Sequence, residues 1–136
     1  MPDQRLAKGI LDTSVVIDLE RIEPLTLPVE VAVTAITMAE LAAGPHATTD
    51  PAERARRQDR LQRAEAAFDA LPFDSAAARA YGMIYSAVIA KGRKARGVRA
   101  VDLLIAAVAA AQGIPLVTRN PEDFSGLSSI VTIVEI

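Results

Sequence analysis

Residues 97–111 read GVRAVDLLIAAVAAA, and from Val101 to Ala111 every residue is apolar except Asp102. The length of this segment and its alanine and leucine content predict a buried helix. A single carboxylate at the beginning of such a helix is costly to desolvate unless it has a cap, a partner or a metal ion. The elements around this helix must therefore supply whatever lies opposite Asp102.

Four short segments on either side of this helix are predicted to be strands, and they are Lys8–Asp12, Val29–Ala35, Ile114–Thr118 and Ile130–Val134. Helices are predicted after N-cap residues, namely Asp12, Thr34 or Thr37, Asp50 and Asp74. The segment Leu71–Phe73 is predicted to be a short extended connection. Strands that alternate with helices favour an α/β fold, in which a parallel sheet is covered by helices on both faces.

The composition narrows the class of protein. With 136 residues and no linker, the chain is predicted to be a single domain over residues 1–136. The absence of cysteine excludes a disulfide framework and a thiolate metal site, and it fits a cytoplasmic protein. The net charge of −2 does not imply global attraction to nucleic acid. No apolar run reaches the roughly 18 residues of a membrane span, so no membrane partner is expected.

Four acidic residues follow or begin elements at what is predicted to be one edge of the sheet: Asp12, Glu40, Asp102 and Asp123. Carboxylates that converge there repel one another unless a divalent cation joins them. Oxygen ligands without cysteine or clustered histidine favour Mg²⁺ or Mn²⁺ over Zn²⁺. Such a site can lower the pKa of a water ligand and stabilise charge that develops on phosphorus.

Each of these acids also has an ordinary explanation when it is considered alone. Asp12 is equally suited to cap a helix, and Asp102 to interact with the dipole of its own helix. Glu40 alone would be an ordinary helix residue, and Asp123 alone would be a solvated one. The hypothesis of a functional site therefore depends on their convergence.

Four motifs resemble those of PIN-domain proteins: ILDTSVVIDL from Ile10, TAITMAEL from Thr34, VDLLIAAVA from Val101 and LVTRNPEDF from Leu116. They occur in the order and at the intervals of that family, over nearly the whole chain from Ile10 to Val134. The sequence is most similar to VapC-type toxins of bacterial toxin–antitoxin pairs. The ordered set is specific, although each motif alone is weak.

The resemblance implies a three-layer α/β/α PIN-like fold with a central parallel sheet of four to five strands. It also implies a small ribonuclease that uses Mg²⁺ or Mn²⁺ to hydrolyse RNA phosphodiesters, commonly in tRNA or rRNA. Such toxins usually form homodimers, and a cognate antitoxin holds them inactive by filling the active-site groove.

The family's acidic residues correspond to Asp12, Glu40 and Asp102, and the role of metal ligand transfers most securely to Asp12 and Asp102. The fourth acidic position is either Asn120 or Asp123, and we expect Asp123 to be the acidic contributor. The resemblance also implies that the hydroxyls of Thr13 and Thr118 orient carboxylates or water.

Basic residues beside the acids are candidates for RNA contact, namely Arg93, Arg96 and Arg99 within Lys91–Arg99, and Arg119. The alternative for Lys91–Arg99 is a solvated helix end. The arginines of residues 54–63 are expected to form a solvated helix face.

Three other functions are alternatives for this sequence. A phospho-acceptor receiver domain would have an adjacent acidic pair near the first strand, but Leu11 precedes Asp12. A haloacid-dehalogenase-like phosphatase would have a second aspartate two residues after Asp12, where Ser14 stands. A non-catalytic PIN-like interaction module is the third alternative, and it would not need the four acids.

Overall fold

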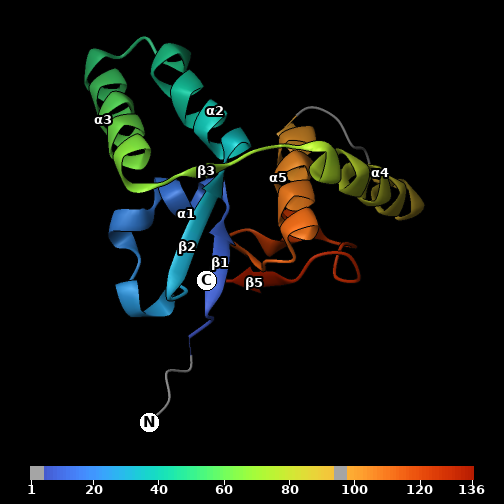
Figure 1. Ribbon diagram of the computed structural model, residues 1–136. Helices are drawn as coiled ribbons and strands as arrows, with labels where there is room; N and C mark the ends of the chain where they lie inside the picture. Colours follow the sequence, from blue (N-terminus) through green and yellow to red (C-terminus); the bar gives the residue numbers. More distant parts are fainter. Residues whose placement is uncertain (1–4, 94–97) are drawn as a thin grey trace.

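The computed structural model describes residues 5–93 and 98–136, and its centre is a parallel sheet of five strands (Figure 1). The strands are β1 (Lys8–Leu11), β2 (Glu30–Thr34), β3 (Ala70–Leu71), β4 (Leu116–Thr118) and β5 (Ile133–Glu135). Their order across the sheet is β3-β2-β1-β4-β5, and every pair is parallel. The predicted fold class and parallel sheet are confirmed.

The helices are α1 (Thr13–Ile17), α2 (Ala35–Ala43), α3 (Pro51–Ala67), α4 (Ser75–Ala90) and α5 (Val98–Gln112). Three of them begin as the cap residues predict, because the side chains of Thr34, Asp50 and Asp74 each accept a hydrogen bond from the backbone N–H three residues later. The helix α5 is followed by Gly113, whose φ of +66° suits glycine and turns the chain toward β4. The short 3₁₀ turns include η3 (Gly44–Ala47) and η4 (Pro121–Phe124).

Two hydrophobic cores cover the two faces of the sheet. Ile10 and Leu116 pack into one core with residues of α4 and α5. Their neighbours Leu11 and Val117 pack into the other core with residues of α1, α2 and α3. The alternation arises because successive side chains of a strand point to opposite faces. Figure 1 shows the resulting layers, with α4 and α5 on one side of the sheet and α1 and α3 on the other.

Two predicted elements differ from the structure. The predicted extended connection Leu71–Phe73 begins within a strand, because β3 pairs with the end of β2 through Ala70 and Leu71. The last strand begins at Ile133 instead of Ile130, because the N–H groups of Ile130 and Val131 bond back to the Leu127 carbonyl in a turn. Backbone pairing decides both cases, and a two-residue strand carries no side-chain pattern.

The order in which strands are added to the sheet reverses at β1. The chain passes from β1 to β2 on one side, and β4 joins β1 on the other side. In open parallel sheets, ligands bind at such a point, outside the carboxyl ends of the strands. No helix within residues 5–93 and 98–136 has the length and apolar character needed to cross a membrane.

Candidate active site

Asp12 lies at the switch point, directly after β1 and at the N-cap position of α1. Its side chain is buried, with the residue 4% exposed. The Oδ2 atom accepts hydrogen bonds from Ser14 Oγ and from Thr118 Oγ1, both at 2.9 Å. The Oδ1 atom is buried without a hydrogen-bond partner. Among the described residues, every other buried side-chain nitrogen or oxygen atom has one. A buried carboxylate oxygen without a partner is unfavourable unless a ligand is bound there.

Glu40 approaches Asp12 from α2. Thr13, the residue after Asp12, donates its hydroxyl to Glu40 Oε1 at 2.6 Å and also contacts the Thr37 hydroxyl at 3.0 Å. Burial raises the pKa of the Glu40 carboxyl, and the charge of Asp12 adds to this, while the Thr13 hydrogen bond opposes it. The beginning of α1 and the middle of α2 therefore form one polar contact.

Asp102 is half-buried on the first turns of α5. Its pKa is raised to about 7, first by burial and then by the negative charges of Asp12, Asp123 and Glu40, while Arg99 lowers it. The four predicted acids thus lie within electrostatic reach of one another. That these acids together form one functional site stays a prediction.

The segment after β4 completes the rim of the site. Asp123 is half-buried in η4, and its backbone carbonyl accepts a hydrogen bond from Arg99 Nη1 at 3.1 Å. Asn120 donates its backbone N–H to Thr118 Oγ1 at 3.0 Å, and its side chain is exposed. Asp123 therefore contributes charge to Asp102, which the neutral Asn120 does not.

Among the arginines predicted to contact RNA, Arg93 and Arg99 donate to backbone carbonyls of η4. Arg119 donates its backbone N–H to Ser14 Oγ at 3.2 Å, and its side chain lies 3.5 Å from Asp18 Oδ2. Arg96 lies outside the residues that the structure describes. On α3, the expectation of a solvated face holds for Arg56 and Arg63, which are exposed.

That expectation is wrong for Arg57 and Arg60, which are half-buried. They face the helix α2 across a hollow that Glu40 also lines. A surface helix can hide part of a long side chain against its neighbour, and the polar pattern of α3 alone does not show this.

Two site residues were missed by the sequence reasoning. Ser14 enters the sequence analysis only at the position where a phosphatase would have aspartate, but it donates to Asp12 Oδ2. Thr37 was considered only as a cap, but its hydroxyl contacts Thr13. A hydroxyl two residues after a predicted ligand, or three residues before one on a helix, is the signal that could have found them.

The donors that converge here fit a divalent cation in their chemistry. The acids offer only oxygen atoms, and Asp12 Oδ1 is free of protein partners. Within residues 5–93 and 98–136, no group of three or more His, Asp or Glu side chains could hold a metal ion as it stands. Shared coordination of a cation would therefore require these carboxylates to come closer together, and the charge of the cation would offset the repulsion between them.

Comparison with a protein family and with a known relative identifies the family of this chain. The model of the PIN domain matches residues 9–128. Ribonuclease VapC5 of Mycobacterium tuberculosis is 36% identical over 130 residues, which is 93% of each chain. The chain belongs to the PIN-domain family. The predicted resemblance to VapC-type ribonucleases is confirmed, and PIN-domain ribonucleases of this type depend on divalent metal ions.

Solved PIN-domain structures agree with the fold described above. The VapBC-5 toxin–antitoxin structure from Mycobacterium tuberculosis matches with a TM-score of 0.81 and 36% identity, covering 96% of this chain and 98% of that one. The FitAcB structure from Neisseria gonorrhoeae matches with a TM-score of 0.68 and 27% identity, covering 93% and 96%. The prediction of a three-layer PIN-like fold is confirmed.

Proposed function

We propose that this chain is the toxin of a toxin–antitoxin pair and that it cleaves RNA with Mg²⁺ or Mn²⁺ held by Asp12 and Asp102. The observation that carries the proposal is the convergence of four acids beside a buried, unpartnered oxygen of Asp12. The similarity to ribonuclease VapC5 supports the choice of RNA as substrate.

When bound, the cation would lower the pKa of water and neutralise charge on phosphorus and on the leaving oxygen. The chain's own residues would position this chemistry. Ser14 and Thr118 hold Oδ2 of Asp12, which leaves Oδ1 for the ligand. Second contacts of this kind fix the orientation of a ligating carboxylate.

Glu40 is the candidate general base. Thr13 occupies Oε1, so Oε2 is left to take a proton from the attacking water. The raised pKa of Glu40 makes it a better proton acceptor than an ordinary carboxylate. The water oxygen bonds to the scissile phosphorus, the bond from phosphorus to the leaving oxygen breaks, and that oxygen takes up a proton. Asp123 is the alternative acceptor, because its charge also acts on Asp102.

An antitoxin partner is part of the proposal, because the matching VapBC-5 structure belongs to a toxin–antitoxin family. A homodimer is supported by apolar side chains that α4 exposes, with Met83 at 65%, Tyr85 at 46% and Ile89 at 50%. The RNA substrate agrees with action in the cytoplasm. Light scattering of the purified chain tests the dimer, and co-purification with the product of a neighbouring small gene tests the antitoxin.

The decisive experiment measures RNA cleavage by the purified chain with Mg²⁺, with EDTA, and in Asp12→Asn and Asp102→Asn. We expect cleavage with Mg²⁺ only, and a loss of at least about 100-fold in each variant, because each removes a charge from the site. Sequencing the RNA ends after brief expression would identify the substrate. Full activity in both variants would contradict the proposal.

A further inference from the structure

A hollow of about 310 Å³ lies between α2 and α3, and Glu40 is the candidate site acid that lines it. Thr13 and Glu40 line it from the site, and Glu53, Arg57 and Arg60 line it from α3. The candidate active site therefore continues from carboxylates to guanidinium groups within one depression of the surface. This arrangement suits a ligand that extends beyond the reacting atoms and carries negative charge.

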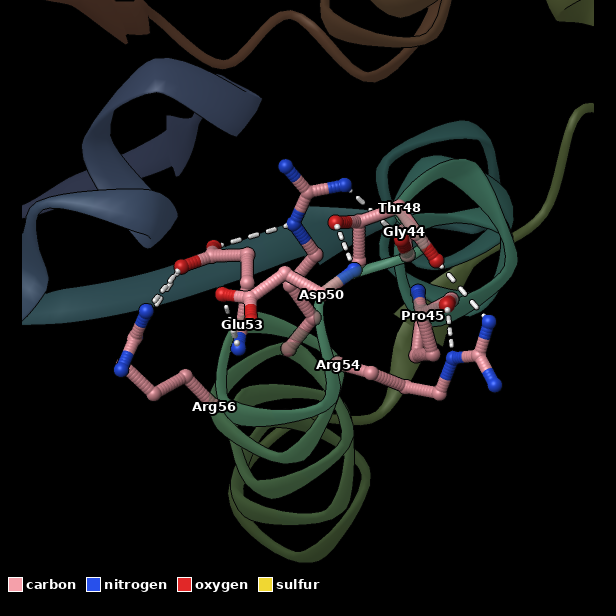
Figure 2. A network of polar contacts seen from close by, with 8 residues as sticks. Gly44, Pro45, Thr48, Asp50, Glu53, Arg54 and Arg56 are labelled. Carbon is pink, nitrogen blue, oxygen red and sulfur yellow. Dashed lines mark hydrogen bonds and ion pairs between the residues drawn. The ribbon is translucent and has the colours of Figure 1, made fainter.

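The wall formed by α3 is anchored to the turn that follows α2. Figure 2 shows this anchor: Arg54 donates through Nε to the Pro45 carbonyl at 3.1 Å and through Nη2 to the Thr48 carbonyl at 2.9 Å. Because α2 also carries Glu40, these contacts hold the two walls of the hollow in a defined relation. The cations of α3 are thus at a set position relative to the acids.

Arg57 is hydrogen-bonded to its neighbours. Its Nε donates to Glu53 Oε1 at 3.1 Å, and its Nη1 donates to the Gly44 carbonyl at 2.9 Å. Its side chain is 31% exposed. Glu53 also binds Arg56 at 2.7 Å, as Figure 2 shows, so one carboxylate holds two arginines. Arg57 is therefore a fixed part of the wall, and its Nε and Nη1 donors are already used.

Arg60 differs from its neighbours. It is half-buried and lines this hollow as well as a second one between α1 and α3, but it makes no hydrogen bond or ion pair with any residue in the described ranges. The arginines on the other side of the acids are bonded to protein groups: Arg99 to the Asp123 carbonyl and Arg119 to Asp18. A partly desolvated guanidinium with unused donors is unfavourable unless a ligand pairs with it.

We infer that Arg60 binds a backbone phosphate of the RNA next to the scissile one, on the α2–α3 side of the site. The inference rests on the proposed ribonuclease function and adds an RNA-contacting residue to it. RNA carries one negative charge per nucleotide, so its approach to four carboxylates needs a compensating cation beside the reacting phosphate. A guanidinium pairs with phosphate through two parallel hydrogen bonds, which would set the register of the strand.

The test compares Arg60→Gln with Arg63→Gln. Both variants remove one positive charge from the same helix, but Arg63 is paired with Asp59 and Glu20 and does not line the hollow. The probe is labelled, unfractionated bacterial tRNA, bound to chains that also carry Asp12→Asn so that no cleavage occurs. Affinity is measured over a range of salt concentrations, and thermal melting verifies that each variant is folded.

For Arg60→Gln we expect about 5- to 10-fold weaker binding and a log–log salt slope smaller by about 0.7, the value of one single-stranded phosphate contact. With Asp12 restored, KM for cleavage should rise by about the same factor while kcat stays within about 2-fold, because a contact made equally before and during reaction changes KM. Arg60→Lys should recover the salt slope, and Arg63→Gln should match the unmodified chain.

Equal binding and equal salt slopes in Arg60→Gln and Arg63→Gln would overturn the inference, while cleavage by the unmodified chain would leave the ribonuclease function standing. An effect of Arg60→Gln on antitoxin binding alone would also overturn it, in favour of a protein ligand. If the unmodified chain neither bound nor cleaved RNA, the proposed function itself would fail.

Discussion

Asp12 is the residue on which the site converges, and its two oxygens are in different situations. Hydroxyls from α1 and β4 hold Oδ2, while Oδ1 is buried without a partner. The sequence supported a carboxylate here, because Asp12 follows a strand and precedes a helix. It did not show which oxygen is free, since this depends on Thr118, which is distant in sequence.

Thr118→Val tests whether the Thr118 hydroxyl orients the Asp12 carboxylate, and we expect it to leave the fold unchanged. The substitution keeps the shape of the side chain but removes the hydroxyl that donates to Asp12 Oδ2 at 2.9 Å. We expect activity and metal affinity to fall about 10- to 100-fold, as is typical when an outer contact to a metal ligand is lost. Cleavage rates and titration calorimetry would measure this, with Thr132→Val, an exposed position, as the control. Unchanged metal affinity in Thr118→Val would contradict the role given to this hydroxyl.

Asp102 should make the metal-free protein less stable as the pH rises. Its pKa is about 7 in the folded chain and near 3.8 when unfolded, so the folded state binds the proton more tightly. The stability associated with this proton is fully present below pH 3.8 and is lost as the pH rises through 7. Asp102→Asn should therefore stabilise the metal-free chain at pH 8, by about 1–2 kcal/mol after allowance for solvent screening.

Urea unfolding across pH 4 to 8 would measure this effect, and the advantage of Asp102→Asn should grow up to about pH 7 and then level off. Asp69→Asn, at an exposed position, is the control and should show no such trend. A constant difference between Asp102→Asn and the unmodified chain at every pH would exclude the raised pKa.

Among the elements, α2 links the sheet to the site. Thr34 ends β2 and caps α2, and the helix then presents Thr37 and Glu40 to the contact with Thr13. The sequence predicted this helix and left open whether Thr34 or Thr37 caps it. The structure assigns the cap to Thr34 and leaves the Thr37 hydroxyl for the site. Helix caps depend on neighbouring residues and were predicted well. The contact between the Thr37 hydroxyl and Thr13 joins residues that are distant in sequence, so the sequence did not show it.

Thr34→Val should affect both stability and cleavage. It removes a fully buried cap that accepts the N–H of Thr37 at 3.1 Å, which we expect to cost about 1–2 kcal/mol of unfolding free energy. It also loosens the beginning of the helix that carries Glu40, so cleavage should fall on the order of 10-fold.

Asp74→Ala is the matched comparison, because it removes the cap of α4, which carries none of the proposed site residues. It should cost about 1 kcal/mol of stability and leave cleavage nearly unchanged. Urea unfolding and steady-state cleavage of both variants measure the two effects. Equal cleavage in Thr34→Val and Asp74→Ala would show that the α2 cap does not position Glu40.

In the molecule as a whole, the strand order brings together acids that are far apart in sequence. Asp12 follows β1, whereas Asp102 lies on α5. The helix α5 packs on the face of the sheet opposite to α1. The parallel α/β pattern predicted that strand ends would share one edge, and the structure agrees. The hollow beside α3 could not be predicted, because the helical pattern of α3 does not show which arginines α2 would cover.

Calorimetric titration of Mn²⁺ into the purified chain tests whether Asp12 and Asp102 share one cation. We expect the unmodified chain to bind, and Asp12→Asn and Asp102→Asn each to lose at least about 10-fold in affinity, while Asp59→Asn on the exposed face of α3 binds like the unmodified chain. Unchanged Mn²⁺ affinity in both Asp12→Asn and Asp102→Asn would contradict a shared metal site.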